Sequence, residues 1–259
     1  MKWTIFRRIV QLGILALFIA GNCYGIKILQ GNLSSSMLFD SINLSDPFAL
    51  LQLFLASFSI ATTSLFGALI VLVFYAIIAP RAYCGWVCPI NLLTDLAAWI
   101  RAKLDIRAKI LNLSNKTRYY LVVLALVCSG FFSIAAFETL NFVGFFTRAV
   151  TSLSITAVAI AIVVVVFEVF AGNRVICSHL CPLGGFWAII SKFSLIRIYH
   201  NVSKCEKCNK CKTVCPEVQV LDLIGKQDFK ISSECISCGR CVEICHDDAL
   251  SFSILGVKK

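Results

Sequence analysis

Long apolar segments without charges dominate the first two thirds of the chain. Residues 58–79 contain 22 consecutive uncharged residues, and residues 119–137 contain 19. Residues 155–171 are interrupted only by Glu168, and residues 9–29 form a weaker segment that contains Asn22 and Lys27. Because a helix needs about 20 apolar residues to cross a bilayer, this pattern predicts four transmembrane helices. The first segment follows Arg7 and Arg8 as a signal peptide would, but it lacks a small-residue cleavage site, so we expect it to be retained.

The composition supports a membrane protein. Hydrophobic residues make up 59% of the 259-residue chain, and charged residues make up only 15%, whereas about a quarter of the residues in a soluble domain are charged. The formal net charge is +10, which by itself would also suit a nucleic-acid-binding protein.

The placement of the positive charges explains the net charge without nucleic acid. Basic residues gather before the first apolar segment and between the second and third, at Lys2, Arg7, Arg8, Arg81, Arg101, Lys103, Arg107, Lys109, Lys116 and Arg118. The opposite loops carry only Lys27 and Arg148. Cytoplasmic loops are enriched in Lys and Arg, so both termini are predicted to lie in the cytoplasm and the chain to span the bacterial inner membrane.

The composition changes near residue 203, where apolar segments end and cysteines and lysines become frequent. We therefore expect two domains, a transmembrane domain at residues 1–202 and a small cytoplasmic domain at residues 203–259. The second domain is too short to fold on a large hydrophobic core and needs a bound cofactor or a crosslink.

The transmembrane part contains an internal repeat. The six-residue segment "CGWVCP" begins at Cys84, and "CSHLCP" begins at Cys177, 93 residues later. Aligning the two C-x3-C-P motifs also aligns Arg81 with Arg174, and each motif follows an apolar segment and precedes an amphipathic one. The pattern predicts an all-α bundle of two units in the same orientation, which is a parallel repeat, with a small α+β domain after it.

The C-terminal domain carries the most specific signal in the chain. Two segments, which begin at Cys205 and Cys235, both have the spacing C-x2-C-x2-C-x3-C, which is the spacing of bacterial two-cluster ferredoxins, where the fourth cysteine binds the cluster of the other half. The predicted ligands of the first 4Fe-4S cluster are Cys205, Cys208, Cys211 and Cys245. The predicted ligands of the second are Cys235, Cys238, Cys241 and Cys215. Structural zinc would need only two C-x2-C pairs, so eight cysteines in this doubled spacing favour two clusters over zinc. Disulfides are not expected in the cytoplasm.

Four lysines lie around the first ferredoxin motif, at Lys204, Lys207, Lys210 and Lys212. They would either attract an acidic partner or offset the negative charge of the cluster, and the sequence favours neither alternative.

The cysteines of the repeated motif form a second, less specific candidate site. Cysteines four residues apart share one face of a helix, and Pro89 and Pro182 would each begin the next helix. The repeat would then gather Cys84, Cys88, Cys177 and Cys181 at the cytoplasmic edge of the membrane. Four thiolates suit an iron–sulfur centre or another soft metal, while redox-active thiols without metal and cysteines packed as small apolar residues are the alternatives.

Two polar residues near the second motif have ordinary explanations. His179 stands where Trp86 stands in the first motif, and with no second histidine nearby we do not expect it to bind a metal. Glu168 lies near the cytoplasmic end of its apolar segment, where we expect it to reach water or pair with Arg174.

On the outer side, Asp46, Glu138 and Arg148 lie beside apolar and aromatic residues. An apolar cleft next to a carboxylate would suit a quinol, which must release protons as its electrons leave. These three residues are therefore the candidate quinol site. Anchoring of aromatic side chains at the membrane surface is the alternative explanation.

Taken with its two C-x3-C-P motifs, the doubled ferredoxin spacing and "SDPFALLQ" at residues 45–52, the chain resembles the NapH family. Members are ferredoxin-type quinol dehydrogenase components of periplasmic nitrate reductase systems. The resemblance implies oxidation of menaquinol or ubiquinol from the membrane quinone pool, and electron transfer to a periplasmic four-cluster ferredoxin subunit, a dihaem or multihaem cytochrome and then nitrate reductase. It does not imply that this chain reduces nitrate.

Two other functions remain open. The chain would be a maturation factor that reduces or transfers a metal such as copper through the C-x3-C-P thiols, or a redox-sensing membrane ferredoxin that regulates a partner. The chain has only two methionines, Met1 and Met37, so it lacks the Met-rich segment that many copper sites use.

Overall fold

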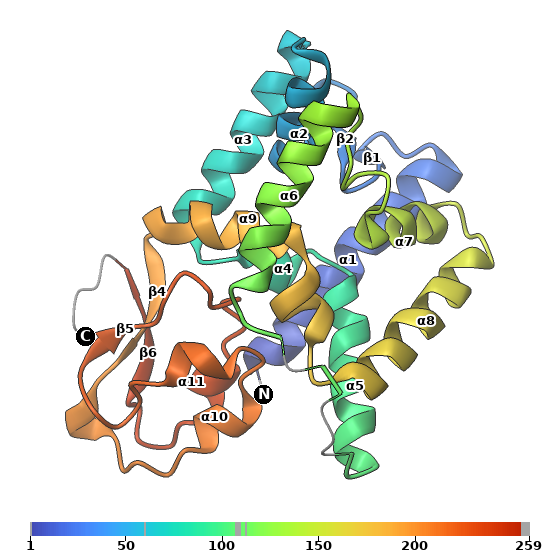
Figure 1. The fold of residues 1–259 in the computed structure, drawn as a ribbon. Helices are drawn as coiled ribbons and strands as arrows, with labels where there is room; N and C mark the ends of the chain where they lie inside the picture. The colour runs from blue at the N-terminus through green and yellow to red at the C-terminus, as the bar shows by residue number, and fades with distance from the viewer. Residues whose placement is uncertain (1, 60, 107–109, 112, 255–259) are drawn as a thin grey trace. The chain divides into compact units, whose positions relative to one another are not determined.

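A computed structural model describes residues 2–59, 61–106, 110–111 and 113–254 (Figure 1). Arg107 and Lys109, which contributed to the charge argument, lie outside the described residues, as do residues 255–259 of the predicted C-terminal domain. The chain forms two compact units. Unit 1 comprises Met1–Gln11, Val73–Val87 and Trp187–Lys259, and unit 2 comprises Leu12–Leu72 and Cys88–Phe186.

Helices make up most of the first 190 residues. They are α1 (Lys2–Tyr24), α2 (Pro47–Ser57), α3 (Thr62–Ile78), α4 (Ala82–Trp86), α5 (Ile90–Lys103), α6 (Thr117–Phe132), α7 (Phe142–Thr151), α8 (Thr156–Ala171), a π-helical turn (Ile176–Leu180) and α9 (Pro182–Ile190). Each predicted apolar segment therefore contains a helix. Among the described residues, one helix, α1, is both long and apolar enough to cross a membrane, and five shorter apolar helices contain 10–17 residues.

Two of the shorter helices end where the backbone becomes left-handed. Helix α2 ends at Phe58 with φ 50°, and α6 ends at Ser133 with φ 54°. Helix α3 consequently begins four residues after the predicted start of its segment, and α6 ends five residues before the predicted end. At 1.5 Å per residue, the 16 or 17 residues of α3, α6 and α8 span about 24–26 Å, slightly less than the roughly 30 Å of bilayer hydrocarbon. Helix length alone therefore does not confirm four spans.

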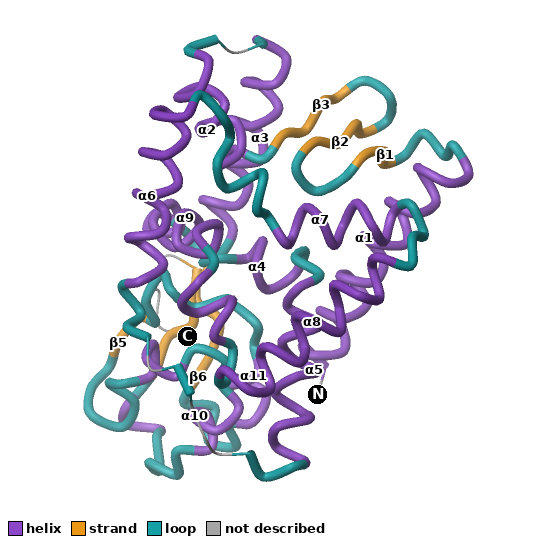
Figure 2. Tube along the Cα trace, turned by 45° about the vertical axis from the view of Figure 1, so that its right-hand side comes forward, coloured by secondary structure: helices purple, strands orange, loops and turns teal. Residues whose placement is uncertain are grey.

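Unit 2 combines packed helix pairs with a small sheet that the sequence did not predict. Helix α5 packs against α8, α2 against α6, and α7 against α8. The strands β1 (Leu29–Gly31), β2 (Ser35–Leu38) and β3 (Ile42–Ser45) form an antiparallel meander (Figure 2). Strands of three or four residues are too short to show an alternating pattern, so the expected all-α architecture of this part is incomplete.

Helix α3 approaches the meander closely at one glycine. A Cβ atom on Gly67 would overlap the carbonyl oxygen of Asn43 in β3. Only glycine permits this contact between the helix and the strand.

Unit 1 contains a three-stranded sheet and two short helices (Figure 1). The strands are β4 (Ile196–His200), β5 (Phe229–Lys230) and β6 (Leu250–Ile254), and β4 pairs antiparallel with both others. The helices α10 (Lys210–Val214) and α11 (Arg240–Ile244) pack against each other. A core that includes Ile198, Leu221 and Ile231 fills the space between these elements. The central strand β4 lies before residue 203, the predicted start of the C-terminal domain. The composition does not reveal this strand, because its alternating apolar residues continue the apolar composition of the preceding segment.

Candidate functional site

Two cavities in unit 1 are lined by the ferredoxin cysteines. The first has an empty volume of about 320 Å³ and is lined by Cys205, Cys208, Cys211 and Cys245, together with the polar residues His200, Asn209, Lys210 and Asp247 and with apolar residues. The second has an empty volume of about 310 Å³ and is lined by Cys215, Cys235, Cys238 and Cys241. The structure thus brings together the two crossed sets of four cysteines that the spacing predicts.

The local backbone explains how each half supplies a cysteine to the other. Helix α10 begins after Asn209 with φ 56°, and α11 begins after Gly239 with φ 74°. Both helices end at the fourth cysteine of their motif, because Cys215 and Cys245 have extended backbones with ψ 126° and 109°. The chain therefore leaves each helix at this cysteine, which lines the cavity of the other half.

The chemistry of these cavities fits iron–sulfur clusters. Burial raises the pKa of Cys235 to about 12 and that of Cys241 well above its ordinary value. Such thiols need a bound cation to become thiolates, which are the forms that bind metal. Among the described residues, no group of three or more His, Cys, Asp or Glu side chains could hold a single metal ion. A 4Fe-4S cluster does not need such a group, because each of its four irons is bound by a different cysteine.

The cysteines of the repeated motif lie in both units. Cys88, Cys177 and Cys181 belong to unit 2. Burial raises the pKa of Cys177 well above its ordinary value, and the nearby thiols of Cys88 and Cys181 add to the rise. The structure therefore brings these three cysteines within electrostatic reach of one another. Cys84 belongs to α4 in unit 1, and its place in a shared site remains a prediction from the repeat.

The prolines of the repeated motif lie at the beginnings of helices, which confirms the prediction for them. Pro89 is the N-cap of α5, and Pro182 is the first residue of α9. A missing N–H costs nothing at such positions.

Glu168 does not reach water as expected, because its side chain is 1% exposed. Its carboxylate accepts hydrogen bonds from the backbone N–H groups of Val175 at 2.9 Å and Ile176 at 2.8 Å. The backbone N–H of Arg174 also donates to this carboxylate, and the Arg174 guanidinium forms an ion pair with Asp95 of α5. Glu168 therefore binds the start of the π-helical turn that carries Cys177, because the N–H groups there have no partners within the turn.

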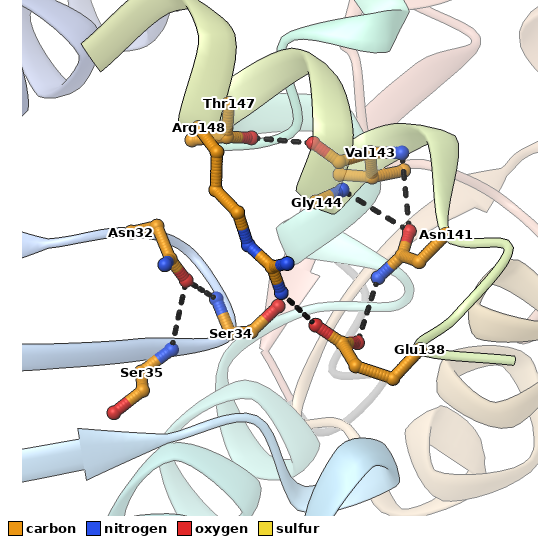
Figure 3. A network of polar contacts seen from close by, with 9 residues as sticks. All are labelled: Asn32, Ser34, Ser35, Glu138, Asn141, Val143, Gly144, Thr147 and Arg148. Atoms are coloured by element: carbon orange, nitrogen blue, oxygen red, sulfur yellow. Dashed lines mark hydrogen bonds and ion pairs between the residues drawn. The ribbon is translucent and has the colours of Figure 1, made fainter. Parts of the chain in front are cut away.

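The three candidate quinol-site residues belong to unit 2, and two of them are in contact (Figure 3). Arg148 Nη2 donates to Glu138 Oε1 at 2.7 Å, and Asn141 Nδ2 donates to Glu138 Oε2 at 3.0 Å. Asn141 also caps α7, because its Oδ1 accepts from Val143 N at 3.1 Å and Gly144 N at 3.2 Å. The cap fixes Glu138 relative to the helix that carries Arg148.

Asp46 is buried near this network. Its side chain is 7% exposed and accepts a hydrogen bond from Phe48 N at 3.1 Å, which caps α2. Burial raises the pKa of Asp46 to about 7, the Phe48 hydrogen bond opposes the rise, and the nearby Glu138 adds to it. The carboxyl group therefore changes its protonation state near neutral pH.

An apolar cavity lies directly beyond Asp46 along the chain. It has an empty volume of about 500 Å³ and lies between α2 and α3. Its lining is entirely apolar and consists of Pro47, Leu50, Leu51, Phe54, Leu65, Ala68, Leu69 and Leu72. A ring or an isoprenoid chain would find an apolar surface here next to a titratable group.

Family models assign most of the chain to iron–sulfur proteins. A model described as "4Fe-4S binding domain" matches residues 60–107 and 153–198, and one described as "4Fe-4S dicluster domain" matches residues 197–246. The "Ferredoxin-type protein NapH" of Haemophilus influenzae is 39% identical, with 97% of this chain and 90% of that protein covered. This chain belongs to the NapH family.

Other relatives agree with this assignment. The NapH protein of Escherichia coli K12 is 33% identical to this family member over 97% of the chain and 89% of the relative. The "Methylamine utilization ferredoxin-type protein MauN" of Paracoccus denitrificans is 35% identical over 85% of the chain and 78% of the relative. No solved structure matches the chain.

The two stretches matched by one family model each contain one C-x3-C-P motif. Within this NapH-family chain the repeat therefore extends over residues 60–107 and residues 153–198. Because the model is described as 4Fe-4S binding, this match favours iron–sulfur chemistry as the context of both motifs.

Sequence reasoning missed three residues around the sites of this NapH-family chain. Asn141 could have been found, since an Asn before an apolar helix is a common N-cap. His200 lines the first cysteine cavity, is fully buried, and has Nδ1 3.0 Å from the carbonyl oxygen of Gln227. It ends an alternating strand, where no local signal distinguishes it. The third is Glu217, which lines the second cysteine cavity and forms an ion pair with the distant Arg81.

Proposed function

We propose that this chain is a membrane-bound iron–sulfur electron-transfer subunit that oxidises menaquinol or ubiquinol. The observation that carries the proposal is the pair of cavities, each lined by four cysteines from both halves of the doubled motif. Such clusters transfer single electrons without bond formation, and a protein that binds them in a membrane subunit is suited to electron transport.

The proposed ligands follow the cavities. Cluster 1 is bound by Cys205, Cys208, Cys211 and Cys245, and cluster 2 is bound by Cys235, Cys238, Cys241 and Cys215. Residues 203–259 form the cytoplasmic ferredoxin domain together with the strand β4 that precedes them, and residues 1–202 form the membrane domain.

Four membrane spans are proposed for the first domain, at α1, α3, α6 and α8. Each of the last three exposes a series of large apolar side chains, which are Leu65, Phe66, Leu69, Ile70, Val73, Phe74 and Ile77 on α3, Tyr120, Val123, Leu124, Val127 and Phe131 on α6, and Val158, Ile162, Val163, Val166 and Phe170 on α8. Exposed apolar surface of this extent suits contact with lipid. Flanking residues and local thinning of the bilayer accommodate spans that are a few Å short. Both termini are placed in the cytoplasm.

The quinol site is proposed at Asp46, Glu138 and Arg148. A quinol that is oxidised loses two electrons and two protons. Asp46, with a pKa near 7, is suited to accept one of these protons, and the neighbouring apolar cavity is suited to receive the ring. Arg148 holds Glu138 in place through its ion pair.

The four C-x3-C-P cysteines are proposed to act together as an additional metal or cluster site. Support comes from the proximity of Cys88, Cys177 and Cys181 and from the family model that matches both motifs. Thiolates of this kind suit an iron–sulfur centre.

The partners are proposed from the family. Two relatives are named ferredoxin-type protein NapH, and the resemblance implies a periplasmic four-cluster ferredoxin subunit, then a cytochrome and nitrate reductase. The chain is the quinol dehydrogenase component of such a complex and not the subunit that reduces nitrate. A metal-reducing maturation factor or a redox sensor remains the second candidate, favoured only by the buried thiols of the repeated motif.

The decisive experiment is anaerobic reduction of the purified full chain by a water-soluble quinol analogue. We expect the clusters to be reduced in the wild type, as followed by EPR, and a strong loss of the rate in Asp46→Asn. If the C-x3-C-P thiols instead reduce Cu²⁺ without any quinol, as fast as quinol reduces the clusters, the result would favour the maturation factor.

A further inference from the structure

The segment that leads into the first C-x3-C-P motif contacts the loop that carries the ligands of cluster 2. Ser237 lies between Cys235 and Cys238, and its Oγ donates to the carbonyl oxygen of Pro80 at 2.8 Å. In return, Trp86 Nε1 donates to the carbonyl oxygen of Ser237 at 3.1 Å. Both ends of residues 80–86 therefore bind the same ligand loop, and all of these residues belong to unit 1.

A glycine makes the approach between these segments close. A Cβ atom on Gly85 would overlap the carbonyl oxygen of Ile236, which is also in the ligand loop. The carbonyl oxygen of Gly85 accepts a buried hydrogen bond from Gln11 Nε2 at 3.0 Å. Gly85 directly follows Cys84, so the backbone of the motif itself is in van der Waals contact with the loop of cluster 2.

A buried ion pair joins the remaining ligand segment of cluster 2 to the same turn. Arg81 Nη1 lies 2.7 Å from Glu217 Oε1 and donates to the carbonyl oxygen of Glu234 at 2.9 Å. The two side chains are 1% and 3% exposed. Glu217 follows Cys215 by two residues, and Glu234 directly precedes Cys235. One guanidinium group therefore binds both of the segments that supply ligands to cluster 2.

The start of α1 covers the same half of the ferredoxin domain. Thr4 Oγ1 donates to Glu243 Oε2 of α11 at 2.7 Å. The ring of Trp3 lies edge-on to the ring of Trp86, with 6.5 Å between the ring centroids.

The two clusters consequently have different surroundings. Cys235, Cys238 and Cys241 are 9%, 5% and 5% exposed. In the other half, Cys208 is exposed, and Lys204, Lys207 and Lys210 are exposed beside it.

We propose that residues 80–86 form a specific binding surface for the ligand segments of cluster 2, and that Arg81 positions these segments and compensates the charge of the cluster. Cluster 2 is then the inner cluster, which exchanges electrons with the membrane part beside Cys84. Cluster 1 is the outer cluster, which exchanges electrons with a soluble partner. The inference rests on the proposed function insofar as it assumes that both clusters are present. Transfer of one electron between them oxidises one cluster and reduces the other, and no bond or proton is involved.

The charge of Arg81 gives this proposal a measurable consequence. Arg81 Nη1 donates to the carbonyl oxygen of Glu234, which directly precedes Cys235, so its positive charge lies beside the ligands of cluster 2. Reduction adds a negative charge to the cluster, and a buried positive charge nearby favours it. Loss of Arg81 should therefore lower the reduction potential of cluster 2 and leave that of cluster 1 unchanged.

The experiment is an EPR-monitored redox titration of the full chain in detergent with dithionite as reductant. Cys245→Ser and Cys215→Ser supply reference spectra of the separate clusters. For Arg81→Gln we expect at least a tenfold change in the reduction equilibrium of cluster 2, which is about 59 mV for one electron. Glu217→Gln should shift the potential in the opposite direction, and Arg81→Lys should restore most of the wild-type value.

Two variants test the contact without changing a charge. Gly85→Ala and Trp86→Phe should alter the EPR line shape or potential of cluster 2 alone, and they carry the test if the arginine variants do not fold. Gly13→Ala is the matched control, because a Cβ there meets no atom within 4 Å. Equal shifts in both clusters, or a shift in cluster 1 alone, would overturn the proposal.

The inner and outer positions are tested with a water-soluble dysprosium complex. The complex should speed the spin relaxation of cluster 1 more than that of cluster 2, and the reverse order would contradict the proposal. Dithionite replaces quinol in every titration, so a failed quinol site leaves this test intact. Absence of both clusters from the wild type would instead contradict the proposed function.

Discussion

Arg81 and Arg174 occupy the same position in the two halves of the repeat, and both have a left-handed backbone, with φ 43° and 57°. Both side chains are also buried, with exposed fractions of 1% and 3%. A residue with a large side chain in this conformation costs roughly 1–3 kcal/mol. The same strain at the same place in both halves agrees with a common origin of the two motif-bearing turns.

The two arginines differ in the carboxylates that they bind. Arg81 pairs with Glu217 in the ferredoxin domain, whereas Arg174 pairs with Asp95 in α5. The first motif is thereby tied to the ligand segments of cluster 2 and the second to the helical part of unit 2. The two halves therefore share the left-handed arginine, but the segment that follows it is α-helical in α4 and π-helical at Ile176–Leu180, and the two arginines bind different parts of the chain.

The crossed ligand sets predict opposite effects for two similar substitutions. Cys215→Ser should remove the cluster bound by Cys235, Cys238 and Cys241, although Cys215 belongs to the first motif. Cys245→Ser should remove the cluster bound by the first motif, because each fourth cysteine lines the cavity of the other half. Iron analysis should give about four irons fewer in each variant, and EPR should show that the lost signals differ. Cys128→Ser is the control, and loss of the same signal in both variants would contradict the crossing.

The raised pKa of Asp46 predicts a pH-dependent stability. The folded-state pKa of about 7 lies above the 3.8 of a free aspartate side chain, so ionisation opposes folding. The stability that the neutral Asp46 carboxyl group contributes is fully present below about pH 4 and is lost as the pH rises toward 7. Asp46→Asn keeps an N-cap for α2 and should remove this decline. Thermal denaturation of the full chain at pH 5 and pH 8 will check the effect.

The same substitution should slow quinol oxidation at pH 7 by about 10²–10⁴-fold, since general-base catalysis contributes about this much. Asp40→Asn is the matched control, because Asp40 forms an exposed ion pair with Lys27 at 2.7 Å and should leave the rate unchanged. If Asp46→Asn and Asp40→Asn oxidise quinol equally fast, Asp46 is not the proton acceptor.

The cysteine sets could be predicted from the sequence because their spacing is local. Within each motif, Cys205 to Cys215 and Cys235 to Cys245 lie within eleven residues, and the cluster geometry imposes that spacing. The apolar segments were likewise found as helices, because the uncharged runs are long. Their ends were not found, since the left-handed turns at Phe58 and Ser133 involve residues with no preference for that conformation.

Apart from the crossed cysteines, contacts between distant residues could not be predicted. Arg81 and Glu217 are 136 residues apart, and neither belongs to a pattern that requires a partner. Arg81 was recognised only as a charge that indicates topology and as a member of the repeat. The burial of Glu168 was not predicted either, because the N–H groups of Val175 and Ile176 that bind its carboxylate belong to a π-helical turn that no local pattern indicates.

The charge pattern predicts the topology of the membrane domain. Reporter fusions after Lys103 and after Ile254 should both indicate the cytoplasm, and a fusion after Ser41 should indicate the periplasm. A periplasmic signal after Ile254 would contradict the placement of the ferredoxin domain.

The buried pair of Arg174 and Asp95 predicts a large loss of stability when one partner is removed. Both side chains are less than 10% exposed, so Arg174→Gln leaves an uncompensated buried charge and should cost about 3–5 kcal/mol. The double variant with Asp95→Asn should recover part of this loss. The control is Lys27→Gln, whose exposed pair with Asp40 contributes roughly 0–1 kcal/mol. Denaturation midpoints of the wild type, Arg174→Gln, Asp95→Asn and the double variant will show whether the two changes are coupled.

The four C-x3-C-P cysteines should behave as one functional group. Cys88, Cys177 and Cys181 lie close together, and the repeat adds Cys84. If they share a metal or cluster, the single variants Cys84→Ser and Cys177→Ser should lose nearly as much quinol-dependent electron transfer as the variant that lacks all four, because groups that act as a unit are not additive. The fourfold variant should also contain less metal than the wild type while both ferredoxin clusters remain. Equal metal content in the two proteins would rule out a shared site, and unchanged activity would show that the repeated motif is structural.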